Sequence, residues 1–324
     1  MKQFVHNKIV ALVVLVLALV LGWIIYSPQE NELSYQKLGL NINTVQPDQI
    51  KLLGNSFWIT DYSQLYFFNL ELNLITDEAI LPEGFTKISI IDADKDQIIL
   101  QSISDGTHTI YSTHYGKFFN LDEEVSTVYL NAGDMVITQK IEDQNKSSLF
   151  LTNFVTGISQ KIGIWDEAYP ISLLKVSENE FYLYSEPSEL YNQPLYKLTI
   201  APEKLEKYKD NFGFDMKMDL NGKWILLSRF DQNNEVKSIL YDVKTKMEKD
   251  LNQSLDHYLS YFNEDKLIAI SNINDKSYIM VYEGDQEVLR KLFGTDTIYS
   301  IAGYSENQAV IATKNKLKII DLNK

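Results

Sequence analysis

The chain has 324 residues, with 30 Lys and Arg against 44 Asp and Glu, so its formal charge is −14, and it has no cysteine. The lack of cysteine excludes disulfide frameworks, thiolate zinc sites and cysteine catalysis. With 45% apolar and 23% charged residues, the composition is that of a folded chain. Such an acidic chain repels phosphates, so nucleic acid is not an expected partner.

The first predicted element is a membrane span. From Ile9 to Tyr26 there are 18 consecutive residues without a charge, thirteen of them Ile, Val or Leu. As a helix this run covers roughly 27 Å, just enough to cross a bilayer. Lys2 and Lys8 precede it, and this bias favours a cytoplasmic N-terminus and a single-pass protein of the cell membrane. A cleaved signal peptide is the alternative, but Pro28 follows closely and no small-residue cleavage site is present, so we expect an uncleaved anchor.

Beyond residue 45 the sequence changes to short apolar or alternating runs separated by Asn, Asp, Gly and Ser, a pattern typical of strands and tight turns. A polar turn followed at once by an apolar strand recurs seven times. From Asn55 in the first turn to Asn307 in the last there are 252 residues, or six intervals of 42. The strands that follow these turns begin at Phe57, Ile98, Met135, Phe181, Trp224, Leu267 and Ala309.

A second landmark lies at the end of the next strand, where Asn or Asp precedes a hydrophobic residue. It occurs at Asn69, Asn153, Asp242 and Asp321, and the first and last of these are again 252 residues apart. Periods of about 40 to 45 residues with four short strands per unit are typical of propeller blades.

The unit resembles the blade of the β-propeller superfamily, of the WD40-like and TolB-like kind. In such a blade a strand ends in a Tyr-Asp-x-x-Thr-like turn, seen here at Tyr241–Thr245 and more loosely at Thr152–Gly157. The resemblance covers about residues 46–324. It implies an all-β fold, a seven-bladed β-propeller of about 42 residues per blade, preceded by the single N-terminal transmembrane helix. The charged segment Pro202–Lys209 is expected to be a loop with some helical turn.

A ring of blades needs a device that joins its ends. The last strand, Lys316–Asp321, has no room for an outermost partner before Lys324, so we expect a segment within Tyr35–Asn43 to lie beside it. The predicted organisation is therefore a cytoplasmic N-terminus at 1–8, a span at 9–26, a tether and ring-closing strand at 27–45, and the propeller at 46–324.

Candidate binding residues recur in the loops that lead from one blade into the innermost strand of the next. Each such loop carries a carboxylate, and some also carry an aromatic or imidazole group. The carboxylates are Glu83, Glu124, Glu167, Asp210, Asp256 and Asp296, and the neighbouring rings are Trp165 and His257. In a propeller these loops surround one mouth of the central channel, where six acids would attract a cation, an amine or a basic peptide. The alternative is that polar loops of an acidic domain carry acids without any function.

A second candidate is the irregular stretch Glu186–Pro194. It exposes Leu190 and Tyr191 between prolines, as a partner-binding loop would. The alternative is an insertion that only decorates a turn.

Other patterns argue against metals and cofactors. Asp92–Asp96 has the spacing of calcium ligands, but Gln97 and Ile103 stand where Gly and Glu are required, so a plain turn is expected. His108 and His114 have no third ligand nearby. No Gly-x-Ser-x-Gly elbow or glycine-rich phosphate loop occurs.

Three functions remain open, since fold alone carries none. The leading one is a membrane-anchored extracytoplasmic propeller that binds a protein or another ligand. The second is a hydrolase or lyase in which two channel-mouth carboxylates act as acid and base. The third is a lectin, the least favoured, because Trp58 and Trp224 lie in apolar strands and only Trp165 is placed in a loop.

Overall fold

The computed structural model describes ten segments of the chain. They are residues 31–40, 42–61, 63–82, 87–143, 146–165, 169–185, 192–219, 222–251, 253–263 and 266–323. The predicted span Ile9–Tyr26 lies outside them, and no helix within them is long and apolar enough to cross a membrane. In these segments the chain forms 27 strands and two short 3-10 helices, so the predicted all-β class is confirmed.

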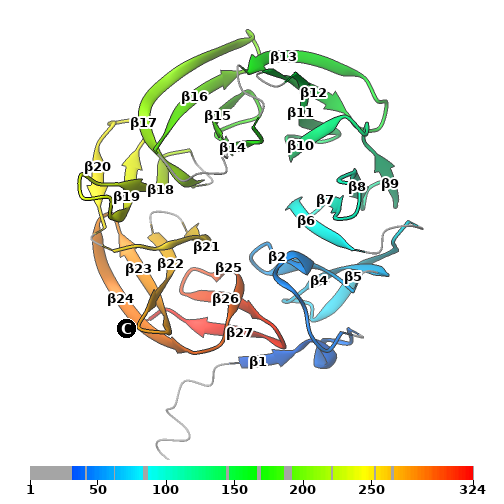
Figure 1. Ribbon diagram of the computed structural model, residues 1–324. Coiled ribbons are helices and arrows are strands. Elements are labelled where there is room, and N and C mark those ends of the chain that lie inside the picture. The colour runs from blue at the N-terminus through cyan, green and yellow to red at the C-terminus, as the bar shows by residue number, and fades with distance from the viewer. Residues whose placement is uncertain are drawn as a thin grey trace, which may run out of the picture.

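The strands form twisted sheets arranged in a ring (Figure 1). Five sheets have four strands and one has seven. The first sheet comprises β2 (Ile50–Leu52), β3 (Ser56–Thr60), β4 (Gln64–Asn69) and β5 (Leu74–Ile80). The second comprises β6 (Ile88–Ala93), β7 (Gln97–Ser102), β8 (His108–Ser112) and β9 (Lys117–Asn120). The third comprises β10 (Val125–Leu130), β11 (Met135–Asp143), β12 (Lys146–Asn153) and β13 (Ser159–Trp165).

The remaining sheets complete the ring. The seven-stranded sheet comprises β14 (Ile171–Lys175), β15 (Glu180–Ser185), β16 (Gln193–Thr199), β17 (Lys204–Met218), β18 (Trp224–Phe230), β19 (Val236–Asp242) and β20 (Glu248–Asp250). The next comprises β21 (Asp256–Asn263), β22 (Lys266–Ile273), β23 (Lys276–Glu283) and β24 (Gln286–Gly294). The last comprises β25 (Ile298–Ser305), β26 (Gln308–Thr313), β27 (Lys316–Asp321) and β1 (Asn31–Ser34).

The long strand β17 belongs to two four-stranded units. Its first part pairs with β16 and its last part with β18, so the described chain contains seven four-stranded units. A Cβ at Gly213 would lie 2.4 Å from the Ser228 carbonyl oxygen, so only glycine allows β17 to pass β18 this closely. The prediction of a loop with a helical turn at Pro202–Lys209 was wrong. Pairs such as Leu198 with Leu205 hold this segment extended against β16.

The counted repeat corresponds to these units. The second strand of each unit begins just after one of the polar turns, and from Ser56 to Gln308 there are again 252 residues. The second landmark caps the turn after the third strand. The Asp242 carboxylate accepts from the amides of Lys244 (2.9 Å) and Thr245 (2.8 Å).

The hydrophobic core lies between neighbouring sheets. Trp58 of β3 packs with Ile98 and Leu100 of β7 in one cluster. Ile99, the residue between them, points the other way and packs with Val136 of β11 in the next cluster. Because one four-stranded sheet cannot bury both its faces alone, the ring is what stabilises each sheet.

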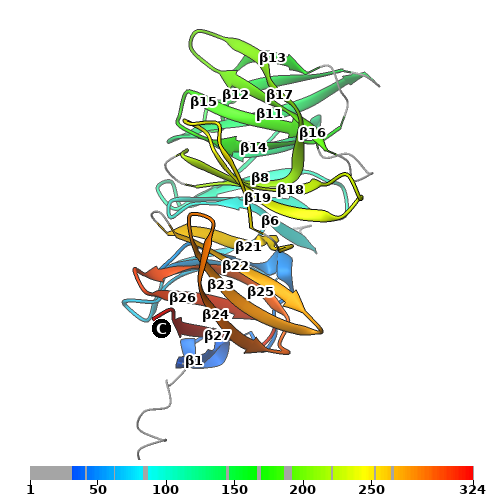
Figure 2. The ribbon, with the colours of Figure 1, turned by 90° about the vertical axis from the view of Figure 1, so that its left-hand side faces the viewer.

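The last sheet is completed from the other end of the sequence. β1 pairs antiparallel with β27, from Asn31 opposite Ile319 to Ser34 opposite Lys316. Both ribbon views place β1 beside β27 at one edge of the ring, and Figure 2 shows this edge from the side. The ring is thus closed by an N-terminal segment, but its predicted position within Tyr35–Asn43 was wrong, since the pairing strand lies directly before it.

The reason lies in the residues after β1. The Ser34 hydroxyl accepts from the Lys37 amide (3.3 Å) and Gly39 adopts φ 81, which begin and end the 3-10 helix η1 (Tyr35–Leu38). Tyr35 is fully buried there, and its hydroxyl donates to the Thr313 carbonyl (2.8 Å). This segment therefore fills the interior under the last sheet instead of extending its edge. A second 3-10 helix, η2 (Pro47–Gln49), leads into β2.

Candidate functional site in the central channel

The innermost strands line the axis of the ring. They are β2, β6, β10, β14, the last part of β17, β21 and β25. Each is entered by a segment that crosses from the preceding sheet, and each leaves by a hairpin into the second strand of its own unit. We call the two ends of the axis the crossover end and the hairpin end. They present different residues.

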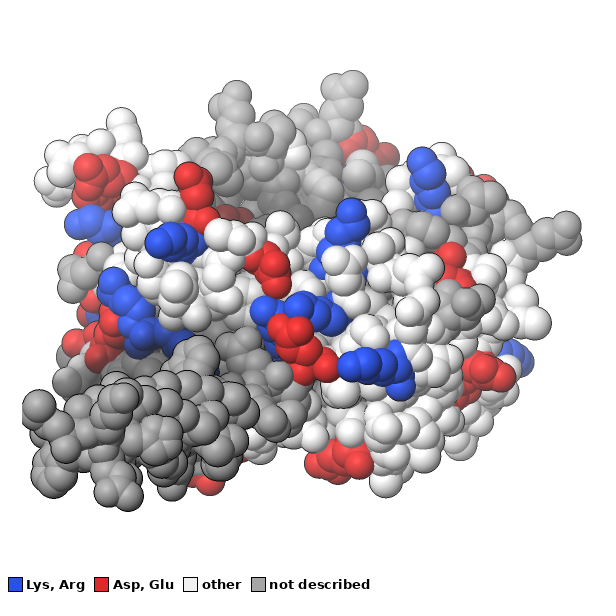
Figure 3. Space-filling model, turned by 90° about the horizontal axis from the view of Figure 1, so that it is seen from below, with Lys and Arg blue, Asp and Glu red and all other residues white. Residues whose placement is uncertain are grey.

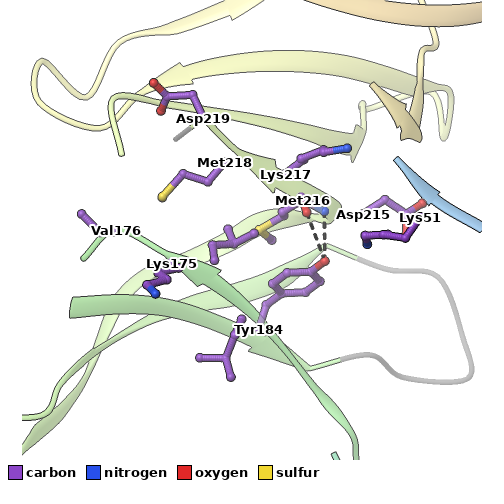
Figure 4. Close-up of a pocket in the computed structure, with 11 residues that line it drawn as sticks. Lys51, Lys175, Val176, Tyr184, Asp215, Met216, Lys217, Met218 and Asp219 are labelled. Carbon is purple, nitrogen blue, oxygen red and sulfur yellow. Dashed lines mark hydrogen bonds between the residues drawn. The ribbon is translucent and has the colours of Figure 1, made fainter. Parts of the chain in front are cut away.

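A cavity of about 620 Å³ opens at the hairpin end (Figure 4). Its walls are Lys51 of β2, Leu173–Val176 at the end of β14, Tyr184 of β15, and Asp215–Asp219 at the end of β17. The Tyr184 hydroxyl accepts from the Met216 amide (3.1 Å), which fixes the wall between β15 and β17.

A second cavity of about 490 Å³ shares Lys51, Leu173 and Lys175 with the first. It extends to Asp92–Asp94 at the end of β6 and to Tyr129–Asn131 at the end of β10. Because the two cavities share walls on the innermost strands, they are parts of one central channel.

Three lysines line this channel. Lys51, Lys175 and Lys217 come from β2, β14 and β17. Lys175 donates to the Asn131 carbonyl and Lys217 to the Ser260 carbonyl. Within the described part of the chain, none of the three forms an ion pair with Asp or Glu. Backbone carbonyls leave the positive charge of a lysine unneutralised.

Lys217 is the most perturbed of the three. Burial lowers the pKa of Lys217 to about 8, repulsion from Lys51 acts in the same direction, and Asp256 acts against both. At mildly alkaline pH its amine and ammonium forms are therefore both populated.

The acids of the channel wall are held by backbone amides. Asp92 accepts from the amides of Ala93 (2.9 Å) and Leu130 (3.1 Å). Burial raises the pKa of Asp92, and Lys51 and these amides oppose the increase. Asp219 caps the turn into β18 by accepting from the amides of Lys223 (2.6 Å) and Trp224 (2.7 Å). Asp92 thus links β6 to β10, and Asp219 shapes the hairpin turn into β18.

The calcium-like segment is such a turn. The Asp94 carboxylate accepts from the amides of Asp96 and Gln97, at 2.8 Å each. No group of three or more His, Asp or Glu side chains in the described segments is placed to hold a metal ion.

Four of the six predicted acidic residues lie in the described part of the chain, at the crossover end. Glu124 precedes β10, Asp210 lies in β17 before its last part, Asp256 begins β21, and Asp296 precedes β25. Glu83 and Glu167 lie outside the described residues, as do the side chain of His257 and both Leu190 and Tyr191 of the predicted partner loop.

Three of these acids have cationic neighbours of their own. Glu124 lies 3.5 Å from Lys140, Asp210 lies 3.0 Å from Lys207, and Asp296 lies 3.2 Å from Lys318. The fourth, Asp256, accepts from the Leu259 amide (3.1 Å). The ion pairs reduce the negative potential of this mouth, and its attraction for a cation stays a prediction.

Trp165 was predicted to lie in a loop, and this was wrong. It is the last residue of β13 and is only 2% exposed. Its ring lies edge-on to Tyr196, with centroids 4.5 Å apart, in the core between the third sheet and β16. Because an indole ring buries a large apolar area, it is stable in the core even at the end of a strand. It cannot be a surface platform at the channel mouth.

The channel lysines were missed by the sequence reasoning. Each lies among apolar neighbours at the end or in the middle of a strand, as in Ile50–Leu52 and Met216–Met218. Lysine is rarely buried without a partner, so a lysine within an apolar innermost strand was the available signal.

No protein-family model matches the sequence, and no curated protein matches it. Solved structures do match. Acylaminoacyl peptidase from Pyrococcus horikoshii is 11% identical with a TM-score of 0.56 over 87% of this chain and 52% of that one, so this chain spans about half its length. The β-propeller domain of Cps50 (Swd1) from Myceliophteria thermophila is 10% identical, with a TM-score of 0.53 over 87% of this chain and 99% of that one.

The β-propeller domain of the Trilobed protease from Pyrococcus furiosus is 12% identical, with a TM-score of 0.56 over 85% of this chain and 97% of that one. It has an open velcro topology, whereas β1 and β27 are paired here. At these identities the likeness shows the fold alone, and the fold of this chain is a β-propeller.

Proposed function

We propose that the chain is a membrane-tethered propeller that serves as a binding module, with its ligand site in the central channel. The observation that carries this proposal is the cavity of about 620 Å³, walled by charged side chains from three innermost strands. Ligand pockets commonly measure about 300 to 1,000 Å³ and combine apolar walls with a few placed polar groups. The volume suits a small molecule or a side chain of a partner protein.

The tether is inferred from the N-terminal sequence and from the place of β1. Only residues 27–30 separate the apolar run, which ends at Tyr26, from Asn31 of β1. This link spans at most about 17 Å. The propeller would therefore lie close to the membrane, on the outer side, with the N-terminus in the cytoplasm.

A protein or a basic peptide is the proposed partner at the crossover end, where Glu124, Asp210, Asp256 and Asp296 lie. The hydrolase or lyase alternative is not advanced, because three of these four acids already pair with lysines.

The tether is tested by fractionation. The full chain is expected to stay in membranes after alkaline carbonate extraction and to be cleaved by protease added to intact cells, whereas a chain starting at residue 27 is expected in the soluble fraction. A full chain released by carbonate would contradict the anchor.

The channel is tested by blocking it. Leu173 lines both cavities, so Leu173→Trp is expected to lose ligands or partners that native mass spectrometry and crosslinking recover with the wild type. Leu72→Trp, at an exposed turn of the first sheet, is the matched control and should retain them. Equal recovery with both variants would exclude the channel as the site.

A further inference from the structure

We propose that the channel binds the oxyanion group of a small ligand, a carboxylate or a phosphate, between Lys51 and Lys217. This inference rests on the proposed function, because it takes the channel as the binding site and names the chemistry of its ligand.

Lys51 on β2 and Lys217 on β17 are far apart in the sequence, but both line the larger cavity, and the charge of Lys51 acts on Lys217. Figure 4 shows them toward the same side of the cavity, with Lys175 and Asp219 toward the other. Two like charges in a partly desolvated wall repel each other, and an anion bound between them would relieve that repulsion.

Two carboxylates of the described wall already have backbone partners. Asp92 and Asp219 are held by backbone amides. The charged groups around Lys217 are Lys51 of β2, Asp256 of β21 and Asp215 of its own strand. Repulsion from Lys51 affects Lys217 more than attraction by Asp256 does. Lys51 and Lys217 thus place two cationic groups in the wall of one cavity of an otherwise acidic chain.

The ammonium groups of the two lysines offer the donors that an oxyanion accepts from. An ammonium group has three hydrogen-bond donors, and Lys217 uses one for the Ser260 carbonyl. The remaining donors of Lys217 and those of Lys51 are available to the oxygens of a carboxylate or phosphate group bound in the cavity that both side chains line. Charge-assisted bonds of this kind are about twice as strong as neutral ones.

Binding should be coupled to protonation of Lys217. An oxyanion binds the ammonium form, whose pKa in the free protein is about 8. Affinity is then full below pH 7 and falls about tenfold between pH 7 and pH 9, and above pH 8 binding takes up a proton. Arginine at this position stays protonated, so Lys217→Arg should remove the pH dependence.

The experiment is calorimetric titration of the full chain in detergent micelles. Inorganic phosphate and succinate are the two probes, and their relative affinities distinguish a phosphate site from a carboxylate site. Lys51→Met and Lys217→Met are each expected to weaken binding about tenfold or more. Lys276→Met, at an exposed lysine of β23 outside the channel, is the control and should bind as the wild type does.

The pH dependence is measured with succinate, which does not titrate in this range, in buffers of different ionisation enthalpy. Wild-type affinity should fall from pH 7 to pH 9 with proton uptake, and Lys217→Arg should bind equally at both. Binding by neither probe, or equal binding by both methionine variants and the wild type, overturns the inference. If Leu173→Trp still loses its recovered ligand or partner in that case, the channel remains the site and only the oxyanion chemistry is wrong.

Discussion

Lys217 and Arg229 lie on adjacent strands of one four-stranded unit, yet Arg229 forms an ion pair with a carboxylate and Lys217 does not form one with a described residue. Arg229 forms a two-point ion pair with Glu248 of β20, at 2.6 and 3.1 Å. Lys209, from the first part of β17, binds the same carboxylate at 2.6 Å. Among the residues that the structure describes, Lys217 donates only to the Ser260 carbonyl oxygen.

The charges at the outer edge of the ring are paired and join neighbouring units, whereas the charge of Lys217 in the channel is not paired with a described carboxylate. Lys209, Arg229 and Glu248 form an outer cluster that joins two neighbouring units. Acidic and basic side chains are also interspersed on the edge of the ring in Figure 3. An unmatched cation costs stability, and a protein that keeps one in a cavity has a use for it, such as a ligand.

The largest expected effect is a gain in stability on removing the channel cation. The pKa of Lys217 is lowered from 10.5 to about 8, so the folded state holds this proton less tightly than the unfolded state. Wild-type stability should therefore rise with pH from about 8 to about 10.5. Lys217→Met should stabilise the protein at pH 7 by about 3 kcal/mol, and the gain should vanish above pH 10.5. Denaturant unfolding of the full chain at pH 7 and pH 10.5 measures this change in stability. If Lys217→Met destabilises the protein at pH 7, the charge of Lys217 is not a cost to the folded state.

The outer cluster should respond in the opposite direction. Arg229→Met removes the ion pair with Glu248 and the bond to the Phe212 carbonyl (2.7 Å), so we expect a loss of about 2 kcal/mol at pH 7. The ion pairs lower the pKa of Glu248 to about 2, so this stabilisation is present above pH 4.5 and is lost as the pH falls through 2. Urea unfolding from pH 7 to pH 2 measures both, with Lys276→Met as the neutral control. A wild-type-like midpoint for Arg229→Met would show that the cluster does not join the units.

The repeat could be predicted because its signals are local. Asn153 accepts from the amides of Val155 (3.1 Å) and Thr156 (2.9 Å), just as Asp242 caps the equivalent turn two units later. A cap of this kind needs only the next few residues, so it leaves a fixed mark in the sequence. Counting such marks gives the number and length of the units.

The site could not be predicted in the same way. Lys51 and Lys217 line one cavity only because the ring turns β2 and β17 toward the same axis, and their distance in sequence gives no sign of it. Trp165 was misplaced because burial at the end of β13 depends on Tyr196 in the next unit. The acids of the crossover loops were predicted by their period, but the lysines that pair with them come from other strands.

The smallest expected effect concerns the closing strand β1, where an exposed acid pairs with one partly exposed and one buried lysine. Glu32 of β1 lies 2.7 Å from Lys316 and 3.4 Å from the buried Lys318, which also pairs with Asp296. These lysines lower the pKa of Glu32, so its contribution is present above the ordinary glutamate pKa and is lost at acid pH. Because Glu32 is 42% exposed, Glu32→Gln should cost only about 0.5 kcal/mol and less at high salt.

Hydrogen exchange of the β1 amides is the sensitive measurement, since four residue pairs hold this strand. Faster exchange confined to β1 and β27 would identify Glu32 as part of the clasp. Faster exchange spread over the whole ring would instead mean that opening at β1 is already global unfolding. In that case pulling on the segment before β1 could not open the last sheet without unfolding the propeller.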